Sequence, residues 1–323
     1  MDLHSVEALV GGAKPVDWRP GDAWLAGGTW LFSEPQPGIR RLLDLASLNW
    51  PGLTVGPNGL EIAATCTIAE LHRFAAQPPP DWTIGPLIQQ CCEAFLASFK
   101  VWNEATVGGN LGNALPAGPM ISLTAALDGG CEVWTPTGET RRVDVVDLIT
   151  GDSRHSLAPG ELIRSITLPA AALSGRTAFR RQSLTTLGRS AALLIGRQDP
   201  DGRFTLGVTA STVRPVRLRF AGLPDADGLR AAIEAAIPAE LYHDDVHGRP
   251  VWRRHLTFRL AEEIRAELTL EPTSPRGDHA LGRKPARADG VPAGAPGEQR
   301  GIVHDHRGKI GRASCRERVS IDV

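Results

Sequence analysis

The chain has 323 residues, of which 42% are apolar and 22% charged, and its formal net charge at pH 7 is −1. This composition is typical of a globular protein with about two domains, and it lacks the ~18-residue apolar run of a transmembrane helix. The near-zero charge, without a basic patch before the C-terminal tail, argues against nucleic acid or an anionic membrane as partner.

Short strands and helices are predicted to alternate near the N-terminus. Strands are expected at 24–26, 42–45, 53–55 and 60–64. The last two flank Asn58-Gly59, a pair that favours a tight hairpin because both turn positions want a positive φ. A helix is predicted from Ile68 to about Ala76, since Thr67 and Glu70 have the spacing of a capping box. The three prolines at 78–80 end it.

A second group of elements surrounds a glycine-rich stretch. Apolar residues between Leu87 and Leu96 recur at helical spacing and lead the chain to this stretch, residues 106–116. A helix is expected to begin at Pro119 and to end with Gly129 as its C-cap. A hairpin is then predicted about residues 136–138, followed by a strand over 162–168.

The remaining periodic part is predicted to form a separate domain. Residues 170–175 are interpreted as a linker, followed by antiparallel strands at 191–195 and 204–210. Two helices follow, one centred on 229–237 and one with an apolar stripe from Trp252 to Leu268. Strands followed by helices indicate an α+β domain. We expect this domain to span residues 176–272.

The periodicity stops at about Thr273. Residues 273–323 contain eight glycines and four prolines, a composition typical of disorder. Residues 309–319 resemble a translated sequencing adapter, so the tail is interpreted as a possible artefact and is left out of the functional argument.

Two glycine segments carry the main functional signal. The first glycine segment consists of Leu25, Ala26, Gly27, Gly28, Thr29, Trp30 and Leu31, and the second of Thr106, Val107, Gly108, Gly109 and Asn110. Glycine allows positive φ and lets a ligand approach with no Cβ in the way. Successive exposed N–H groups in such turns favour anions, above all phosphates. Either segment alone is also compatible with a tight loop between elements.

Together the two segments resemble the FAD-pyrophosphate loops of the flavin subunit of molybdenum hydroxylases, the family of xanthine dehydrogenase and aerobic carbon monoxide dehydrogenase. The resemblance rests on residues 26–29 and 105–111, roughly eighty residues apart, and on the following Ala114-Leu115-Pro116-Ala117. It implies an α+β fold, in which a two-lobed PCMH-type FAD-binding domain at 1–169 precedes the smaller α+β domain.

The resemblance also implies the function and partners. The chain is expected to be a non-covalent FAD oxidoreductase subunit that passes electrons from the iron–sulfur clusters of a small subunit to NAD or another acceptor. A molybdenum-cofactor large subunit would carry the substrate reaction, so a hetero-oligomer is expected. No catalytic or metal-binding residue is assigned to this chain. Its five cysteines lack the spacing of a cluster or zinc site, which favours a reducing, cytoplasmic setting.

The family pattern extends to two further residues. Leu162 stands where the family places an apolar residue on the flavin, and Arg180 where it places a cation. An ordinary strand residue and a solvated arginine are the alternatives. The chain departs from the family pattern at Trp102, Pro119 and Trp30, because polar or charged residues are usual at the corresponding positions.

Two other interpretations stay open. One is a self-contained FAD oxidoreductase of the same superfamily, some members of which attach FAD through a histidine near the first segment. No histidine lies in either glycine segment, which argues against such attachment. The other is a degenerate assembly subunit that has kept the fold and lost FAD.

Overall fold

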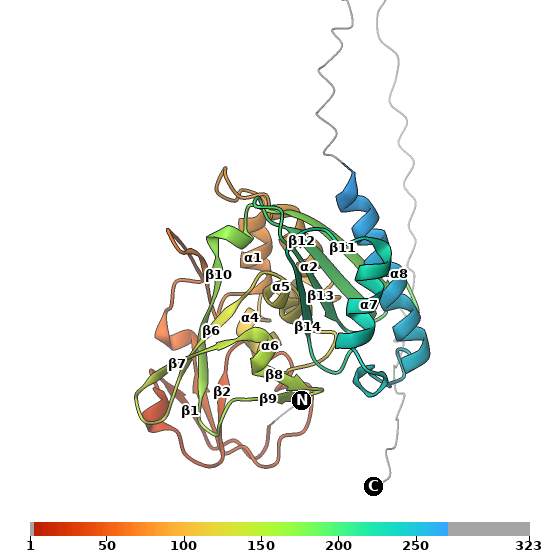
Figure 1. Ribbon diagram of the computed structural model, residues 1–323. Helices are drawn as coiled ribbons and strands as arrows, with labels where there is room; N and C mark the ends of the chain where they lie inside the picture. Colours follow the sequence, from red (N-terminus) through yellow and green to blue (C-terminus); the bar gives the residue numbers. More distant parts are fainter. Residues whose placement is uncertain (1–2, 271–323) are drawn as a thin grey trace, which may run out of the picture. The chain divides into compact units, whose positions relative to one another are not determined.

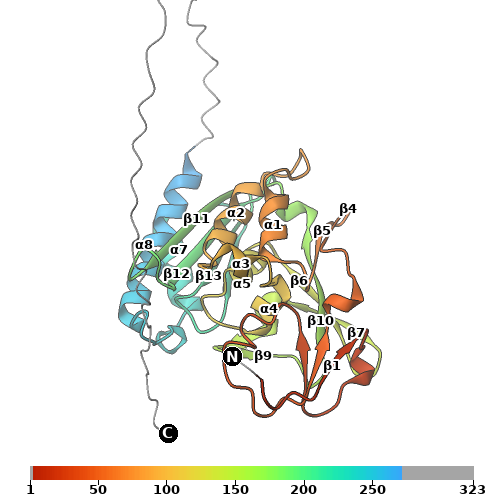
Figure 2. The ribbon, with the colours of Figure 1, turned by 180° about the vertical axis from the view of Figure 1, so that it is seen from behind.

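The computed structural model describes residues 3–270 (Figures 1 and 2). The tail expected at 273–323, with its adapter-like part, lies outside the described residues. Within 3–270, four sheets and several helices alternate, and three of the sheets are antiparallel. This is the α+β class that the sequence predicts.

A small parallel sheet lies near the N-terminus, with the strand order β1–β3–β2. Its strands are Ala8–Gly11 (β1), Asp22–Leu25 (β2) and Arg41–Asp44 (β3). The sequence predicted β2 and β3 but not β1, which is at most half-buried and lacks a strong apolar pattern. Because β2 ends at Leu25, this sheet leads directly into the first glycine segment.

A five-stranded antiparallel sheet has the order β4–β5–β10–β6–β7. Its strands are Leu53–Gly56 (β4), Gly59–Ala63 (β5), Gly130–Trp134 (β6), Thr140–Asp144 (β7) and Leu162–Pro169 (β10). Both predicted hairpins form, but the first turn consists of Pro57 and Asn58, since Gly56 pairs with Gly59. Gly59 has a φ of 124°, and a Cβ there would lie 2.0 Å from the Leu168 carbonyl oxygen. Glycine is therefore required by contact with β10.

The first half of the chain contributes six α-helices to the described residues. They are Ile68–Ala75 (α1), Gly85–Glu93 (α2), Phe99–Trp102 (α3), Val107–Gly112 (α4), Pro119–Ala126 (α5) and Val145–Leu148 (α6). The expected start of α1 is confirmed, since the Thr67 hydroxyl accepts from the Glu70 N–H. The helix expected to reach Leu96 ends at Glu93, and Ser98 caps α3 separately. After α5, the left-handed residue is Asp128 (φ 54°) and not Gly129.

The second half contains a four-stranded antiparallel sheet in the order β11–β12–β13–β14. The strands are Arg176–Ser183, Ser190–Gln198, Phe204–Thr209 and Val216–Phe220, and the helices are Ala226–Ala236 (α7) and Pro250–Thr269 (α8). The sequence predicted the buried β12 and β13 and missed the arginine-rich β11 and β14. A two-stranded sheet, Ile149–Gly151 (β8) with Arg154–His155 (β9), completes the fold. None of the helices within 3–270 has the length and apolarity needed to cross a membrane.

Helix α5 joins the two halves. All eight of its residues are buried, and it packs on α2 and α4 as well as on β12 and β13. A Cβ at Gly207 of β13 would lie only 3.1 Å from the Cβ of Ala126, so the glycine permits close approach of strand and helix. One apolar core therefore runs from the five-stranded sheet through α5 to β12. The division into domains at 1–169 and 176–272 remains a prediction.

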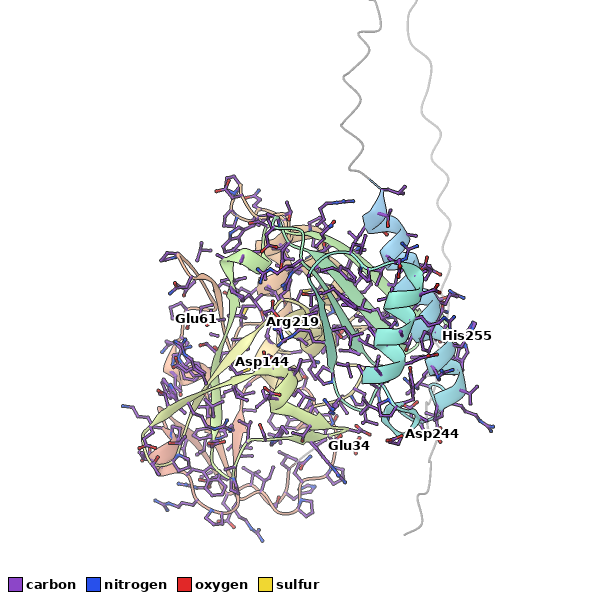
Figure 3. The ribbon with its side chains drawn as sticks, viewed as in Figure 1. Glu34, Glu61, Asp144, Arg219, Asp244 and His255 are labelled. Carbon is purple, nitrogen blue, oxygen red and sulfur yellow. The ribbon has the colours of Figure 1, made fainter. Side chains whose placement is uncertain are left out.

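A cluster of arginines and aspartates, which we call the Arg–Asp cluster, surrounds the C-terminal end of α5. Arg197 Nη2 lies 2.6 Å from Asp128 Oδ2, and Arg197 Nε lies 2.7 Å from Asp199 Oδ1. Arg217 pairs with both Asp128 and Asp144. Figure 3 labels Asp144 and a further member, Arg219, which also pairs with Asp128. These pairs tie β7 and α5 to β12 and β14.

Candidate functional site

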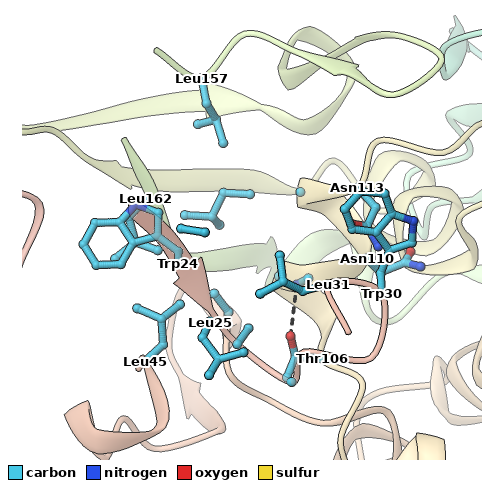
Figure 4. Close-up of a pocket in the computed structure, with 18 of the residues that line it drawn as sticks. Trp24, Leu25, Trp30, Leu31, Leu45, Thr106, Asn110, Asn113, Leu157 and Leu162 are labelled. Carbon is cyan, nitrogen blue, oxygen red and sulfur yellow. Dashed lines mark hydrogen bonds between the residues drawn. The ribbon is translucent and has the colours of Figure 1, made fainter. Parts of the chain in front are cut away.

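A cavity of about 530 Å³ opens between the parallel sheet, the two glycine segments and the start of β10 (Figure 4). Cofactor sites typically occupy ~300–1,000 Å³. In the view of Figure 4, Trp24, Leu45 and Leu162 lie at one end and Trp30, Asn110 and Asn113 at the other. The cavity therefore has an apolar end and a polar end.

The first glycine segment packs against the chain just before the second. A Cβ on Gly27 would lie 1.7 Å from the Glu104 carbonyl oxygen, so only glycine fits there. Gly28 has a φ of 67°, and a Cβ on it would meet the Phe32 ring at 2.5 Å. Within residues 3–270, the N–H groups of residues 27–31 have no hydrogen-bond acceptor. Unpaired N–H groups of this kind can bind an anion, and that role stays a prediction for this segment.

The second glycine segment differs from the expected turn, because it forms the start of helix α4. Thr106 is the N-cap, and its hydroxyl accepts from the Gly109 N–H at 3.0 Å (Figure 4). The N–H groups of Val107 and Gly108 donate to the carbonyls of Cys66 and Ala64. The Asn110 N–H donates to the Thr106 carbonyl, so the expectation that this segment offers free backbone donors to a phosphate is wrong for residues 107–110.

Gly108 is required by close packing. Its φ is not positive, but a Cβ there would lie 2.4 Å from the Cβ of Ala64 and 2.6 Å from its Cα. The glycine lets α4 lie directly on the end of β5, with the Gly108 N–H donating to the Ala64 carbonyl at 3.0 Å. The second segment thus forms a wall of the cavity, with the side chains of Thr106 and Asn110 on it.

Two of the three departures from the family pattern have structural roles. Pro119 occupies the first turn of α5, and the Asn110 side-chain oxygen accepts from the N–H of Met120, the next residue. This leaves the Asn110 amide group free to donate. Trp102 donates from its indole Nε1 to the Phe95 carbonyl at 2.9 Å. The third departure, Trp30, lines the cavity and is 46% exposed.

The apolar end of the cavity suits an aromatic ring. Leu45 and Leu162 are buried, and Trp24, Leu25 and Leu157 complete the wall. The indole Nε1 of Trp24 is buried and has no hydrogen-bond partner within the described chain. Such an orphaned donor is uncommon in a finished core and is compatible with a site that closes on a polar ligand.

The carboxylates that line the cavity are neutralised. Asp22 accepts a two-point hydrogen bond from Arg41, and Glu161 accepts one from Arg141 at 2.7 and 2.8 Å. These hydrogen bonds hold the pKa values of Asp22 and Glu161 below their usual range. No lysine or arginine is among the described lining residues, and His155 of β9 is the one histidine there. Neutral N–H groups would therefore meet a bound phosphate.

The structure brings all the candidate site residues into the cavity lining except two. Val107 is fully buried in the core beside it. Arg180 of β11 pairs with Glu263 and Glu267 of α8, at 3.2 and 2.6 Å, on the second sheet. Sequence reasoning missed the contributions of Trp18, Trp24 and Leu45, which carry no motif. The pairing of β2 with β3 brings Trp24 and the end of β3, next to Leu45, together.

Replacing Arg180 by glutamine is expected to change the Kd for FAD by less than about twofold. The side chain is partly exposed, and pairs of this kind contribute roughly 0–1 kcal/mol to folding. A titration of the variant with FAD measures the effect. A large loss of FAD affinity without loss of fold would instead assign Arg180 to the cofactor site, as the family pattern implies.

The four cysteines of the described residues lie in the core. Cys66, Cys91, Cys92 and Cys131 are all unpaired and buried, and burial raises the pKa of Cys92 and Cys131 to about 12. They are small apolar core residues, as the sequence predicts for Cys91 and Cys92. Residues 3–270 contain no group of three or more His, Cys, Asp or Glu placed to hold a metal ion.

Comparison with known sequences gives a family model and relatives that are subunits of enzyme complexes. Residues 7–171 match the family model described as the FAD binding domain in molybdopterin dehydrogenase. The chain is 27% identical over 180 residues to the nicotine 6-hydroxylase medium subunit of Paenarthrobacter nicotinovorans, covering 51% of this chain and 61% of the relative. It is 24% identical over 207 residues to the 6-hydroxypseudooxynicotine dehydrogenase complex subunit alpha of the same organism, covering 60% and 69%. The match thus spans less than two thirds of the first relative.

Solved structures share the fold. The quinoline 2-oxidoreductase structure from Pseudomonas putida 86 aligns with a TM-score of 0.66 at 18% identity, covering 83% of this chain and 98% of that one. The CO dehydrogenase structure from Oligotropha carboxidovorans aligns with a TM-score of 0.68 at 21% identity, covering 82% and 99%. At these identities the likeness concerns the fold alone, and it confirms the fold class expected from the sequence.

Proposed function

The chain belongs to the family of FAD-binding domains of molybdopterin dehydrogenases, and we propose that it is the electron-transferring flavin subunit of a molybdenum-containing hydroxylase or dehydrogenase. FAD is its cofactor. Family membership confirms the resemblance seen in the two glycine segments. The route of the electrons, the partner chains and the residues that hold FAD belong to the proposal.

The observation that carries the proposal is the meeting of both glycine segments on one cavity. The unpaired N–H groups of residues 27–31 support placing the pyrophosphate at the first segment, because neutral oriented donors stabilise phosphate charge. The amide of Asn110 and the hydroxyl of Thr106 supply further donors. The apolar end supports placing the isoalloxazine ring against Leu162. Bound FAD supplies the redox chemistry, and the protein orients it and excludes water.

The proposed partners would supply redox centres for which residues 3–270 offer no group of ligands. An iron–sulfur cluster needs about four thiolates at suitable spacings, and the described cysteines are buried apart from the cavity lining. We therefore assign the clusters and the molybdenum cofactor to two other subunits in a hetero-oligomer. The curated relatives are named as a medium subunit and as a complex subunit, which supports this assignment. Electrons would leave to NAD or another acceptor, in a cytoplasmic setting.

Affinity purification of the tagged full chain from its native cells tests this function. We expect FAD, iron and molybdenum to elute together with two partner chains, one larger and one smaller than this chain. We expect the isolated chain to hold FAD without oxidising a substrate. A chain that oxidises a substrate by itself at an ordinary rate would contradict the subunit assignment and support a self-contained FAD oxidoreductase.

A further inference from the structure

Strand β10 contains an irregularity next to the cavity. Ile166 pairs with Cys131 of β6, and Ile163 pairs with Val133, so three steps along β10 correspond to two along β6. The extra residue lies between Ile163 and Ser165, and it is Arg164. A shift of one residue moves every following side chain to the opposite face of a strand.

This bulge changes which side chains of β10 share a face beside the cavity, whose lining includes both Leu162 and Ile163. Ile163, Ile166 and their partners on β6 are all part of the apolar core. If the same residues formed a regular strand without the bulge, Leu162 would share the core face with Ile166, because they are four residues apart and side chains alternate with a period of two. With it, Leu162 lies opposite Trp134 and forms part of the cavity wall.

Two tryptophans hold the extra residue. The Arg164 guanidinium carbon lies 4.3 Å from the ring centre of Trp50 and 5.8 Å from that of Trp134. The two rings meet edge to face at 5.4 Å. The Arg164 side chain is only 17% exposed, and its Nη1 lies 3.7 Å from Glu61, beyond hydrogen-bond distance. The Arg164 cation thus stacks on the rings and forms an ion pair with Glu61 that lacks a hydrogen bond.

The backbone of Arg164 connects the bulge to the second glycine segment. Its carbonyl accepts from the Ala64 N–H at 3.0 Å, and the Ala64 carbonyl accepts from the Gly108 N–H at 3.0 Å. Ala64 itself lines the cavity and contacts Gly108. Arg164 is therefore linked to Leu162 in the cavity wall through β10, and to α4 through Ala64.

We propose that Arg164, held between Trp50 and Trp134, is a positioning residue that presents Leu162 to the flavin ring. The proposal rests on the placement of FAD in this cavity. It assigns to Arg164 no contact with FAD. Its role is to fix the bulge, and so the face from which Leu162 is displayed.

The test compares Arg164→Met and Arg164→Lys in the full chain with a control, Arg142→Met. Arg142 is an exposed arginine of β7 in the same sheet. We expect Arg164→Met to raise the Kd for FAD about tenfold. The variant loses a largely desolvated cation–π contact, and the cost appears in FAD binding because the bulge that presents Leu162 is no longer held. The shape of the visible absorption band and the fluorescence of bound FAD should change, because the wall beside the ring moves. Lysine should restore part of both.

If Arg164→Met fails to fold, Trp50→Leu takes its place in the test. This variant removes the nearer ring, leaves the sequence of β10 unchanged, and should change the flavin spectrum in the direction expected for Arg164→Met. Wild-type Kd and wild-type flavin spectra in both variants would overturn the proposal, even if the melting temperature of the flavin-free protein fell. If the wild-type chain takes up no FAD, the proposed function fails and this inference with it. If the wild type binds FAD and Arg164→Met behaves as Arg142→Met, this inference alone fails.

Discussion

A full chain carrying Gly108→Val is expected to purify with no bound FAD. A Cβ at this position would lie 2.4 Å from the Cβ of Ala64 and 2.7 Å from its carbonyl oxygen, so valine must push α4 away from β5. Such overpacking costs about 1–3 kcal/mol. If the upper end of this cost falls on the FAD-bound state, the affinity for FAD is about a hundredfold weaker. Flavin absorbance per chain after gel filtration measures the effect.

Gly130→Ala is the matched control for that variant. Gly130 lies on β6 outside the cavity lining, and an added Cβ would meet no other atom within 4 Å. It should therefore retain the flavin content of the wild type. Circular dichroism must show that the Gly108 variant still folds. A folded Gly108→Val chain with an unchanged flavin content would remove the second glycine segment from the cofactor site.

Asp128→Asn is expected to lower the free energy of unfolding by about 3 kcal/mol, because it leaves buried arginines without one of their carboxylates. The side chains of Arg197 and Arg217 are 3% and 4% exposed, and both contact Asp128. Asparagine keeps the volume and tolerates the left-handed φ of 54° at this position. The loss of stability would therefore come from the missing carboxylate charge and not from backbone strain. Equilibrium unfolding in urea measures it.

The stability difference between the wild type and Asp128→Asn is expected to depend on pH. Burial alone would raise the pKa of Asp128, but the hydrogen bond and charge of Arg197, with Arg217 and Arg219, outweigh burial and hold that pKa below its usual range. The stabilisation is thus present above the ordinary aspartate pKa of ~3.9 and is lost as the pH falls through the lower folded value. The difference between wild type and variant should shrink below about pH 4.

Asp201→Asn serves as its control, since Asp201 pairs with the exposed Arg203 and such a pair contributes at most about 1 kcal/mol. Equal stability losses in the two variants would contradict the assigned role of the Arg–Asp cluster. So would a loss in Asp128→Asn that does not change with pH.

Local signals in the sequence were sufficient for much of the fold. The capping residue Thr67 predicts the start of α1, and the alternation over 162–168 predicts β10. Strands β11 and β14 could not be found in this way, because their arginines pair with acids far along the chain, such as Glu263 and Asp144. Tertiary ion pairs replace the apolar periodicity on which such predictions rest.

The candidate site shows the same limit. The two glycine segments and Leu162 were predicted as site residues, and all of them except Val107 line one cavity. Their physical roles were not, because Gly28 needs a positive φ whereas Gly27 and Gly108 need closeness to Glu104 and Ala64. Such contacts between distant segments have no signature in the sequence. The bulge at Arg164 is likewise visible only in the pairing of β10 with β6.

The absorbance spectrum of the purified full chain, recorded before and after heat denaturation, tests the central claim most directly. We predict the visible bands of an oxidised flavin before heating, and FAD free in the supernatant afterwards. A colourless chain that stays colourless when FAD is added would contradict FAD binding in this cavity and would favour an assembly subunit that has lost its cofactor.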